Sequence, residues 1–124
     1  GSFDGVLLDA PCSDIGHWRR HPELRWTVRK EDLPALAAQQ RQFLDLAATA
    51  VRPGGVLVYT VATVTVAETT DVINGFLKAH PEFRLDPFPH PLEESTTSEM
   101  LQLWPHLHDT EARFIARLVR TMEK

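Results

Sequence analysis

The sequence has a single cysteine, Cys12, and this scarcity excludes an internal disulfide. A chain without disulfides is typical of a reducing compartment, so we expect a cytoplasmic protein. No apolar run approaches the ~20 residues that a membrane-spanning helix needs, and no signal-peptide pattern opens the chain. Contact with a membrane is therefore not expected. We interpret Gly1 and Ser2 as a cloning scar and residues 3–124 as part of one domain.

A strong positive charge is also lacking, because the formal net charge is −4 at pH 7. The total charge thus gives no indication of a nucleic-acid partner. The segment 17–30 differs, since its four arginines and one lysine face a single acid, which makes the segment +4. Its apolar residues follow no helical or strand period, so we predict a loop. A solvated surface and an RNA contact remain alternative interpretations of this basic segment.

A glycine-rich turn after a strand, which cradles the phosphates of a nucleotide cofactor, is missing as well. The one Gly-Gly pair, Gly54-Gly55, precedes a predicted strand instead of following one. If the fold binds a nucleotide-like cofactor, the glycine-rich half of the site must therefore lie elsewhere.

Hydrophobic periodicity predicts alternating strands and helices. Continuous apolar runs favour strands covered on both faces of a parallel sheet. Asp32 is the expected cap of the first helix, and Thr65 with Glu68 forms a capping box for the second. The order predicts a doubly wound α/β fold that closes with an antiparallel hairpin. The predicted elements are strands at 6–8, 56–61, 83–85, 100–104 and 114–120, helices over 33–51 and 66–80, and a loop over 86–98.

Several short motifs lie at the ends of these elements. The letters DAPCS at 9–13 follow the first strand, and RRHPELRW follows at 19–26. Residues 53–59 read PGGVLVY, and the closing segments read LWPH at 103–106 and FIARL at 114–118. Together these motifs resemble the Sun/Fmu family of ribosomal RNA cytosine-5 methyltransferases, over nearly the whole chain.

The resemblance implies the C-terminal half of a Rossmann-like, S-adenosylmethionine-dependent methyltransferase sheet. In this family a cysteine thiolate adds to C6 of cytosine, which makes C5 nucleophilic enough to accept a methyl group. Asp9 matches the residue that lies beside the cofactor and polarises the base, and Pro11 would shape the same pocket. RNA, ribosomal RNA in particular, is the implied partner. The matching RNA-contact candidates are Arg19, Arg20, Arg25 and Trp26.

The sequence departs from the family at the nucleophile. The family cysteine lies in a YSTCS element, and Ala62 occupies its position here. Val61, Ala67, Thr69 and Arg113 depart from the family pattern too, so natural divergence explains Ala62 better than one engineered replacement. A non-catalytic RNA-binding paralogue is therefore the alternative to an active enzyme.

Cys12 is the remaining candidate nucleophile. The equivalent cysteine in the RNA enzymes assists product release, whereas in DNA cytosine-5 methyltransferases a Pro-Cys in the corresponding loop attacks the base. Attack by Cys12 requires a lowered thiol pKa, which a cationic loop would favour. The alternative for Cys12 is that it is an unreactive residue that only contributes to packing. The alternative for Asp9 is that its carboxylate only accepts hydrogen bonds from the backbone of the loop.

Two further expectations concern partners. His106 and His108 lie two residues apart without cysteines nearby, so we predict a polar loop and no metal site. Without the glycine-rich half, the first strand would lie at an open sheet edge. An open apolar edge favours pairing with another chain, so we predict a homodimer through residues 6–9. We also expect the isolated chain to bind S-adenosylmethionine poorly.

Overall fold

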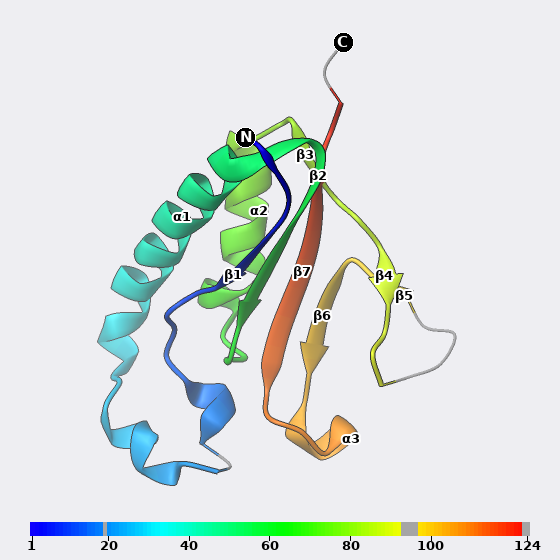
Figure 1. The fold of residues 1–124 in the computed structure, drawn as a ribbon. Helices are drawn as coiled ribbons and strands as arrows, with labels where there is room; N and C mark the ends of the chain where they lie inside the picture. Colours follow the sequence, from blue (N-terminus) through cyan, green and yellow to red (C-terminus); the bar gives the residue numbers. More distant parts are fainter. Residues whose placement is uncertain (19, 93–96, 123–124) are drawn as a thin grey trace.

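The computed structural model describes residues 1–18, 20–92 and 97–122 (Figure 1). Five strands form its main sheet, and their order confirms the α/β pattern. β1 (Phe3–Asp9) runs parallel to β2 (Val51–Val61), and β7 (Arg113–Arg120) lies antiparallel on the other side of β2. β3 (Phe83–Leu85) and β6 (Met100–Leu103) both pair with β7 in antiparallel register. The predicted closing hairpin, β6 with β7, is confirmed.

Two helices pack on the same face of this sheet (Figure 1). α1 (Leu33–Ala50) contacts β1 and β2, and α2 (Thr70–Ala79) packs beside α1. Both helices place one apolar stripe in the core, as their periodicity predicts. The fully buried residues of this core include Leu44, Leu57, Tyr59, Ile73, Phe76, Ala116 and Leu118.

Burial of the strands on both faces, which the continuous apolar runs predict, is found among the described strands only at the end of β2, where Tyr59, Thr60 and Val61 are all buried. β7 alternates between buried and half-buried residues, because helices cover only one of its faces. β1 is the edge strand of the sheet, and Leu7 on it is 69% exposed. Val6 and Leu8 alternate with Leu7 and pack against the core. The sheet therefore has one apolar interior face and one open face.

The first turn between helix and strand also differs from the prediction. β2 begins at Val51, directly after α1, and not at residue 56. Val51 pairs with Phe3, and the register shifts before Gly5 pairs with Val56. Gly54 absorbs this irregularity with a φ of 82°, a left-handed conformation that strains other residues.

The segment between β1 and α1 contains three short 3₁₀-helices: η1 (Ile15–His17), η2 (Pro22–Trp26) and η3 (Lys30–Asp32). Asp32 does not cap α1 as predicted. Its carboxylate accepts a hydrogen bond from the Arg29 N–H at 2.8 Å and so closes η3 instead. The segment predicted to be a loop thus consists largely of short 3₁₀-helical turns.

Smaller elements complete the chain. The predicted loop over 86–98 contains a two-stranded pair, β4 (Phe88–Pro89) with β5 (Thr97–Ser98). η4 (Val66–Glu68) precedes α2, and α3 (Pro105–His108) connects β6 to β7. None of the helices in the described residues is both long and apolar enough to cross a membrane.

Candidate functional site

The carboxyl ends of β1 and β2 lie side by side and bring two loops together. Asp9 pairs with Thr60 at the end of the parallel ladder. Beyond it, the Ala10 N–H donates to the Thr60 carbonyl at 3.1 Å, and the Gly16 N–H donates to the Ala62 carbonyl at 2.7 Å. The Cys12 loop therefore packs directly on the Ala62 loop. This is the edge of a parallel sheet at which α/β proteins bind their ligands.

Gly16 allows this close approach. A Cβ atom at Gly16 would lie 1.8 Å from the Ala112 carbonyl oxygen and 2.7 Å from the Ala62 carbonyl carbon. Both are backbone atoms, which cannot move aside as a flexible side chain can. The glycine thus joins three segments: the Cys12 loop, the end of β2 and the approach to β7.

Glu68 connects the two loops from inside the protein. Its carboxylate is fully buried and accepts hydrogen bonds from the Ser13 N–H at 2.7 Å and the Ser13 hydroxyl at 2.8 Å. The hydroxyls of Thr63 and Thr65 donate to it at 2.8 Å and 2.6 Å. Gln40 Nε2 donates to it at 3.3 Å. One carboxylate therefore holds the loop after β1, the loop after β2 and the helix α1.

The predicted capping box is wrong in its geometry, although Thr65 and Glu68 do meet. Glu68 turns into the core instead of back to the backbone N–H of residue 65. Burial alone raises the pKa of Glu68, but the hydrogen bonds from Thr65, Thr63 and Ser13 outweigh it and hold the pKa below its usual value. Glu68 is therefore a buried carboxylate, stabilised in its charged form.

Cys12 is half-buried, and its thiol differs from the sequence prediction. Burial raises the pKa of Cys12 to about 12, with smaller contributions from the negative charges of Asp14 and Glu68. Backbone hydrogen bonds from Asp14 and Ala62 offset this only in part. The expectation that a cationic loop lowers this pKa is wrong, because burial dominates and the charges that act on the thiol, those of Asp14 and Glu68, are negative. The thiol of the free chain is protonated at neutral pH.

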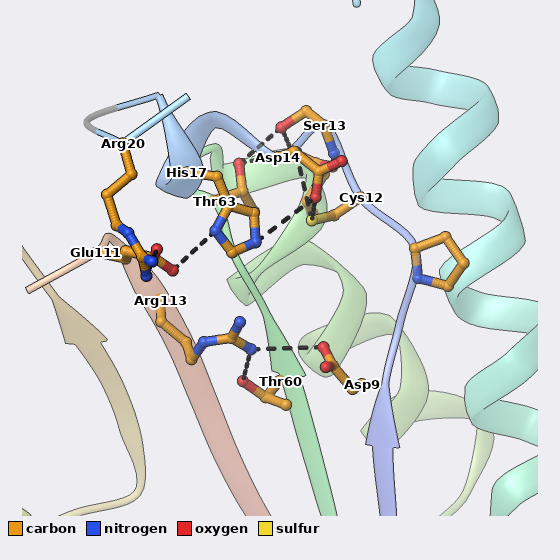
Figure 2. Close-up of polar contacts among 12 residues, drawn as sticks. Asp9, Cys12, Ser13, Asp14, His17, Arg20, Thr60, Thr63, Glu111 and Arg113 are labelled. Carbon is orange, nitrogen blue, oxygen red and sulfur yellow. Dashed lines mark hydrogen bonds and ion pairs between the residues drawn. The ribbon is translucent and has the colours of Figure 1, made fainter. Parts of the chain in front are cut away.

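Asp9 lies at the carboxyl end of β1 and faces Arg113 (Figure 2). Its side chain is 66% exposed, and Arg113 from β7 reaches it at 3.4 Å. The same guanidinium donates to Thr60 Oγ1 at 3.1 Å. Arg113 thus extends across the end of β2 and joins the carboxyl end of β1 to the start of β7. From the sequence alone, Arg113 is only a departure from the family pattern, and nothing indicates this contact.

A second cluster of polar side chains, which includes Arg20, lies beside Arg113. Glu111 accepts from His17 Nδ1 at 2.8 Å and from Arg20 at 3.0 Å (Figure 2). Burial opposes the charge of Glu111, but the nearby His17 and Arg20 lower its pKa overall. A cavity of about 520 Å³ opens here, and Arg20, Glu111 and Arg113 are among its lining residues. Arg20 is thus held at the site by an acid.

The remaining RNA-contact candidates lie farther along the same loop. Arg19 lies outside the described residues. Trp26 is 77% exposed, and the Arg25 guanidinium lies 4.8 Å from its ring centroid. Cation–π contact of this kind gives a flat, positively charged surface suited to a nucleobase and its phosphate. The structure therefore brings Arg20 to the Asp9–Cys12 end of the sheet, while Arg25 and Trp26 form a separate exposed pair.

The fit to a cofactor rests on Asp9 and Pro11. Asp9 offers an exposed carboxylate at the sheet edge, and the Pro11 carbonyl is held by Gln40 Nε2 at 3.0 Å. Both residues lie at or just beyond the carboxyl end of β1. Within the described ranges, no three histidine, cysteine, aspartate or glutamate side chains converge as metal ligands. His108 instead accepts a hydrogen bond from the Trp104 N–H at 3.0 Å.

Comparison with known proteins relates this site to rRNA-modifying enzymes. Residues 1–119 match the protein family described as 16S rRNA methyltransferase RsmB/F. The chain is 42% identical, over 95% of its length, to the putative methyltransferase Rv1407 of Mycobacterium tuberculosis, and covers 26% of that protein. It thus spans about a quarter of this relative.

Solved structures agree with the sequence comparison. The crystal structure of PH0851 superposes with a TM-score of 0.85 and 40% identity, covering 93% of this chain and 26% of that one. NSun6 from Pyrococcus horikoshii, solved with SFG, gives a TM-score of 0.75 and 29% identity, covering 95% of this chain and 30% of that one. The predicted fold class, part of a Rossmann-like methyltransferase sheet, is confirmed.

Proposed function

The chain belongs to the RsmB/F family of 16S rRNA methyltransferases, and from this premise we propose that it carries the base-facing part of an S-adenosylmethionine-dependent RNA cytosine-5 methyltransferase site. The observation that carries the proposal is the junction of Asp9, Cys12 and Ala62 at the carboxyl ends of two parallel strands. The glycine-rich, cofactor-binding part of the domain would lie elsewhere in the polypeptide. Residues 3–124 would then complete one domain with it in the cytoplasm.

The residues have distinct proposed roles. Asp9 would contact the cofactor and polarise the cytosine ring, and Pro11 would shape the pocket beside it. S-adenosylmethionine, when bound, supplies the methyl group. Cys12, the chain's one thiol, would add to C6 or assist release of the product. Since the thiolate is the reactive form, attack by Cys12 requires that RNA or cofactor binding lower its pKa.

RNA would contact the loop between β1 and α1. Arg19, Arg20, Arg25 and Trp26 are the proposed contacts, through phosphate pairing and stacking on bases. Arg20 forms an ion pair with Glu111 in the free chain. To bind an RNA phosphate, Arg20 would have to leave Glu111. The implied substrate is ribosomal RNA, as the family name indicates.

A specific observation favours a second function, an RNA-binding protein without methyl transfer. Ala62 provides no nucleophilic group, and burial keeps the Cys12 thiol protonated in the free chain. A protein with this site would retain the fold and the RNA contacts but not the chemistry. The deciding experiment compares methyl transfer by the whole protein and its Cys12→Ala and Ala62→Cys variants.

For the isolated chain we predict negligible affinity for S-adenosylmethionine, because it lacks the glycine-rich wall of the pocket. Isothermal titration calorimetry tests this directly, and micromolar binding would refute it. A homodimer through the β1 edge is proposed on separate grounds, which are the exposure of Leu7 and the open hydrogen-bonding edge.

A further inference from the structure

The loop between β1 and α1 contains an apolar cavity that the proposed catalytic site does not use. It has a volume of about 210 Å³ and opens between η1 and the start of α1. Its lining residues are Ile15, Trp18, Val28, Arg29, Lys30 and Leu33. η1 also carries His17 and follows directly on the Cys12 loop, so this cavity belongs to the same carboxyl end of the sheet as the candidate site.

The wall of the cavity includes a polar group without a partner. The indole N–H of Trp18 is buried, and none of the described residues accepts a hydrogen bond from it. Buried tryptophan N–H groups usually find an acceptor, because an unmade hydrogen bond is costly. Because this N–H is enclosed by the protein, an occupant of the cavity contacts other atoms of Trp18.

The two charged residues that line the cavity, Arg29 and Lys30, are both cations, and both are exposed. The acids Glu31 and Asp32 follow them in the chain and are not among the lining residues. The segment 17–30 as a whole is +4. A flat ring attached to a phosphate matches an aromatic residue that lines the cavity beside two cations. A neutral apolar protein segment would leave both cations unmatched.

We propose that this Trp18 cavity binds an unstacked base of single-stranded RNA, next to the nucleotide presented to the Asp9–Cys12 site. The base contacts the Trp18 indole, and Arg29 and Lys30 pair with its flanking phosphates. This inference rests on the proposed function in one respect, since it requires that the chain bind RNA. It adds a specificity pocket separate from the residues proposed above for RNA contact.

Photocrosslinking of the unmodified chain tests the proposal without a variant. The probe is a short single-stranded oligouridylate that contains 5-bromouridine, and mass spectrometry locates the adduct. We expect the main adduct on the peptide that contains Trp18. RNA binding with adducts only at Trp26 or elsewhere would overturn the pocket and leave the proposed RNA function intact. Absence of any RNA binding would overturn both.

Variants then measure the contribution of the pocket to RNA affinity. Trp18→Leu keeps an apolar side chain but removes the ring, and it should weaken oligouridylate binding roughly five- to hundredfold, as the loss of one stacked base does. Trp18→Phe keeps an aromatic face and should retain most of the affinity. Lys30→Ala should reduce the slope of log affinity against log salt by about 0.7. Trp104→Phe is the matched control, and equal losses in Trp18→Leu and Trp104→Phe would contradict the proposal.

Discussion

At the scale of the residue, Glu68 is the most constrained side chain of the site. A charged group is almost never fully buried unless it is compensated, because its desolvation costs several kcal/mol. Glu68 has five donors on three segments, so its charge is matched locally. The arrangement fixes Ser13 and Thr63, and through them the loops that carry Cys12 and Ala62.

Replacement of Glu68 should destabilise the protein and change its response to acid. Glu68→Gln keeps the shape but removes the charge that its donors face, at a cost of about 1–3 kcal/mol at neutral pH. The pKa of Glu68 in the folded state lies below the unfolded value of about 4.3. Its contribution is therefore complete above that value and is lost as pH falls through the folded pKa.

Urea unfolding at pH 7 and at a series of pH values below about 4.3 measures both effects. The stability difference between the wild type and Glu68→Gln should be largest at pH 7 and should shrink on acidification. Glu31→Gln, at an exposed position, is the matched control and should change little. A constant difference across this pH range would show that the charge of Glu68 does not contribute.

The Cys12 thiol gives a second residue-scale prediction. Because its pKa is about 12 in the folded chain, alkylation by iodoacetamide should be slow near pH 8 and should rise with pH without a plateau below about pH 11. The same chain in urea should react as an ordinary thiol with a pKa of about 8.5. A rate plateau near neutral pH in the folded chain would contradict the burial argument.

At the scale of the element, the loops at the sheet edge depend on close backbone contact. Gly16→Ala should destabilise the chain by about 1–3 kcal/mol, since its Cβ would overlap two backbone segments. Gly5→Ala is the matched control, because the nearest atom to its Cβ lies 3.9 Å away. Thermal unfolding of both variants is the measurement, and an equal effect of the two would disprove the role assigned to Gly16.

The elements also show where sequence patterns succeed. The apolar runs predict β2, β6 and β7, because a strand needs apolar residues to bury one of its faces in the core. The parallel pairing of β1 with β2 then places Asp9, Cys12 and Ala62 at the same edge of the sheet. The inward turn of Glu68 is not predictable in this way, since a capping box and a core carboxylate have the same spacing. The Arg113–Asp9 contact joins residues 104 positions apart, which no local pattern can indicate.

At the scale of the whole molecule, the open sheet edge predicts self-association. β1 has a strand partner on one side only among the described residues, and Phe3 and Leu7 on it are 61% and 69% exposed. For the isolated chain we expect a dimer in analytical ultracentrifugation and a monomer for Leu7→Lys, since edge lysines block strand pairing. A wild-type monomer at high concentration would disprove pairing through this edge.

The whole molecule combines membership of the RsmB/F methyltransferase family with a single thiol, Cys12. The most direct test is transfer of a labelled methyl group to C5 of cytosine in 16S rRNA by the whole protein, measured with rising pH. We expect methyl transfer to increase with pH, because the Cys12 thiol must lose its proton before it attacks the base. We also expect Cys12→Ala to abolish the transfer. No transfer by the wild type, with a gain in Ala62→Cys, would contradict the proposal and identify a protein that has lost the reaction.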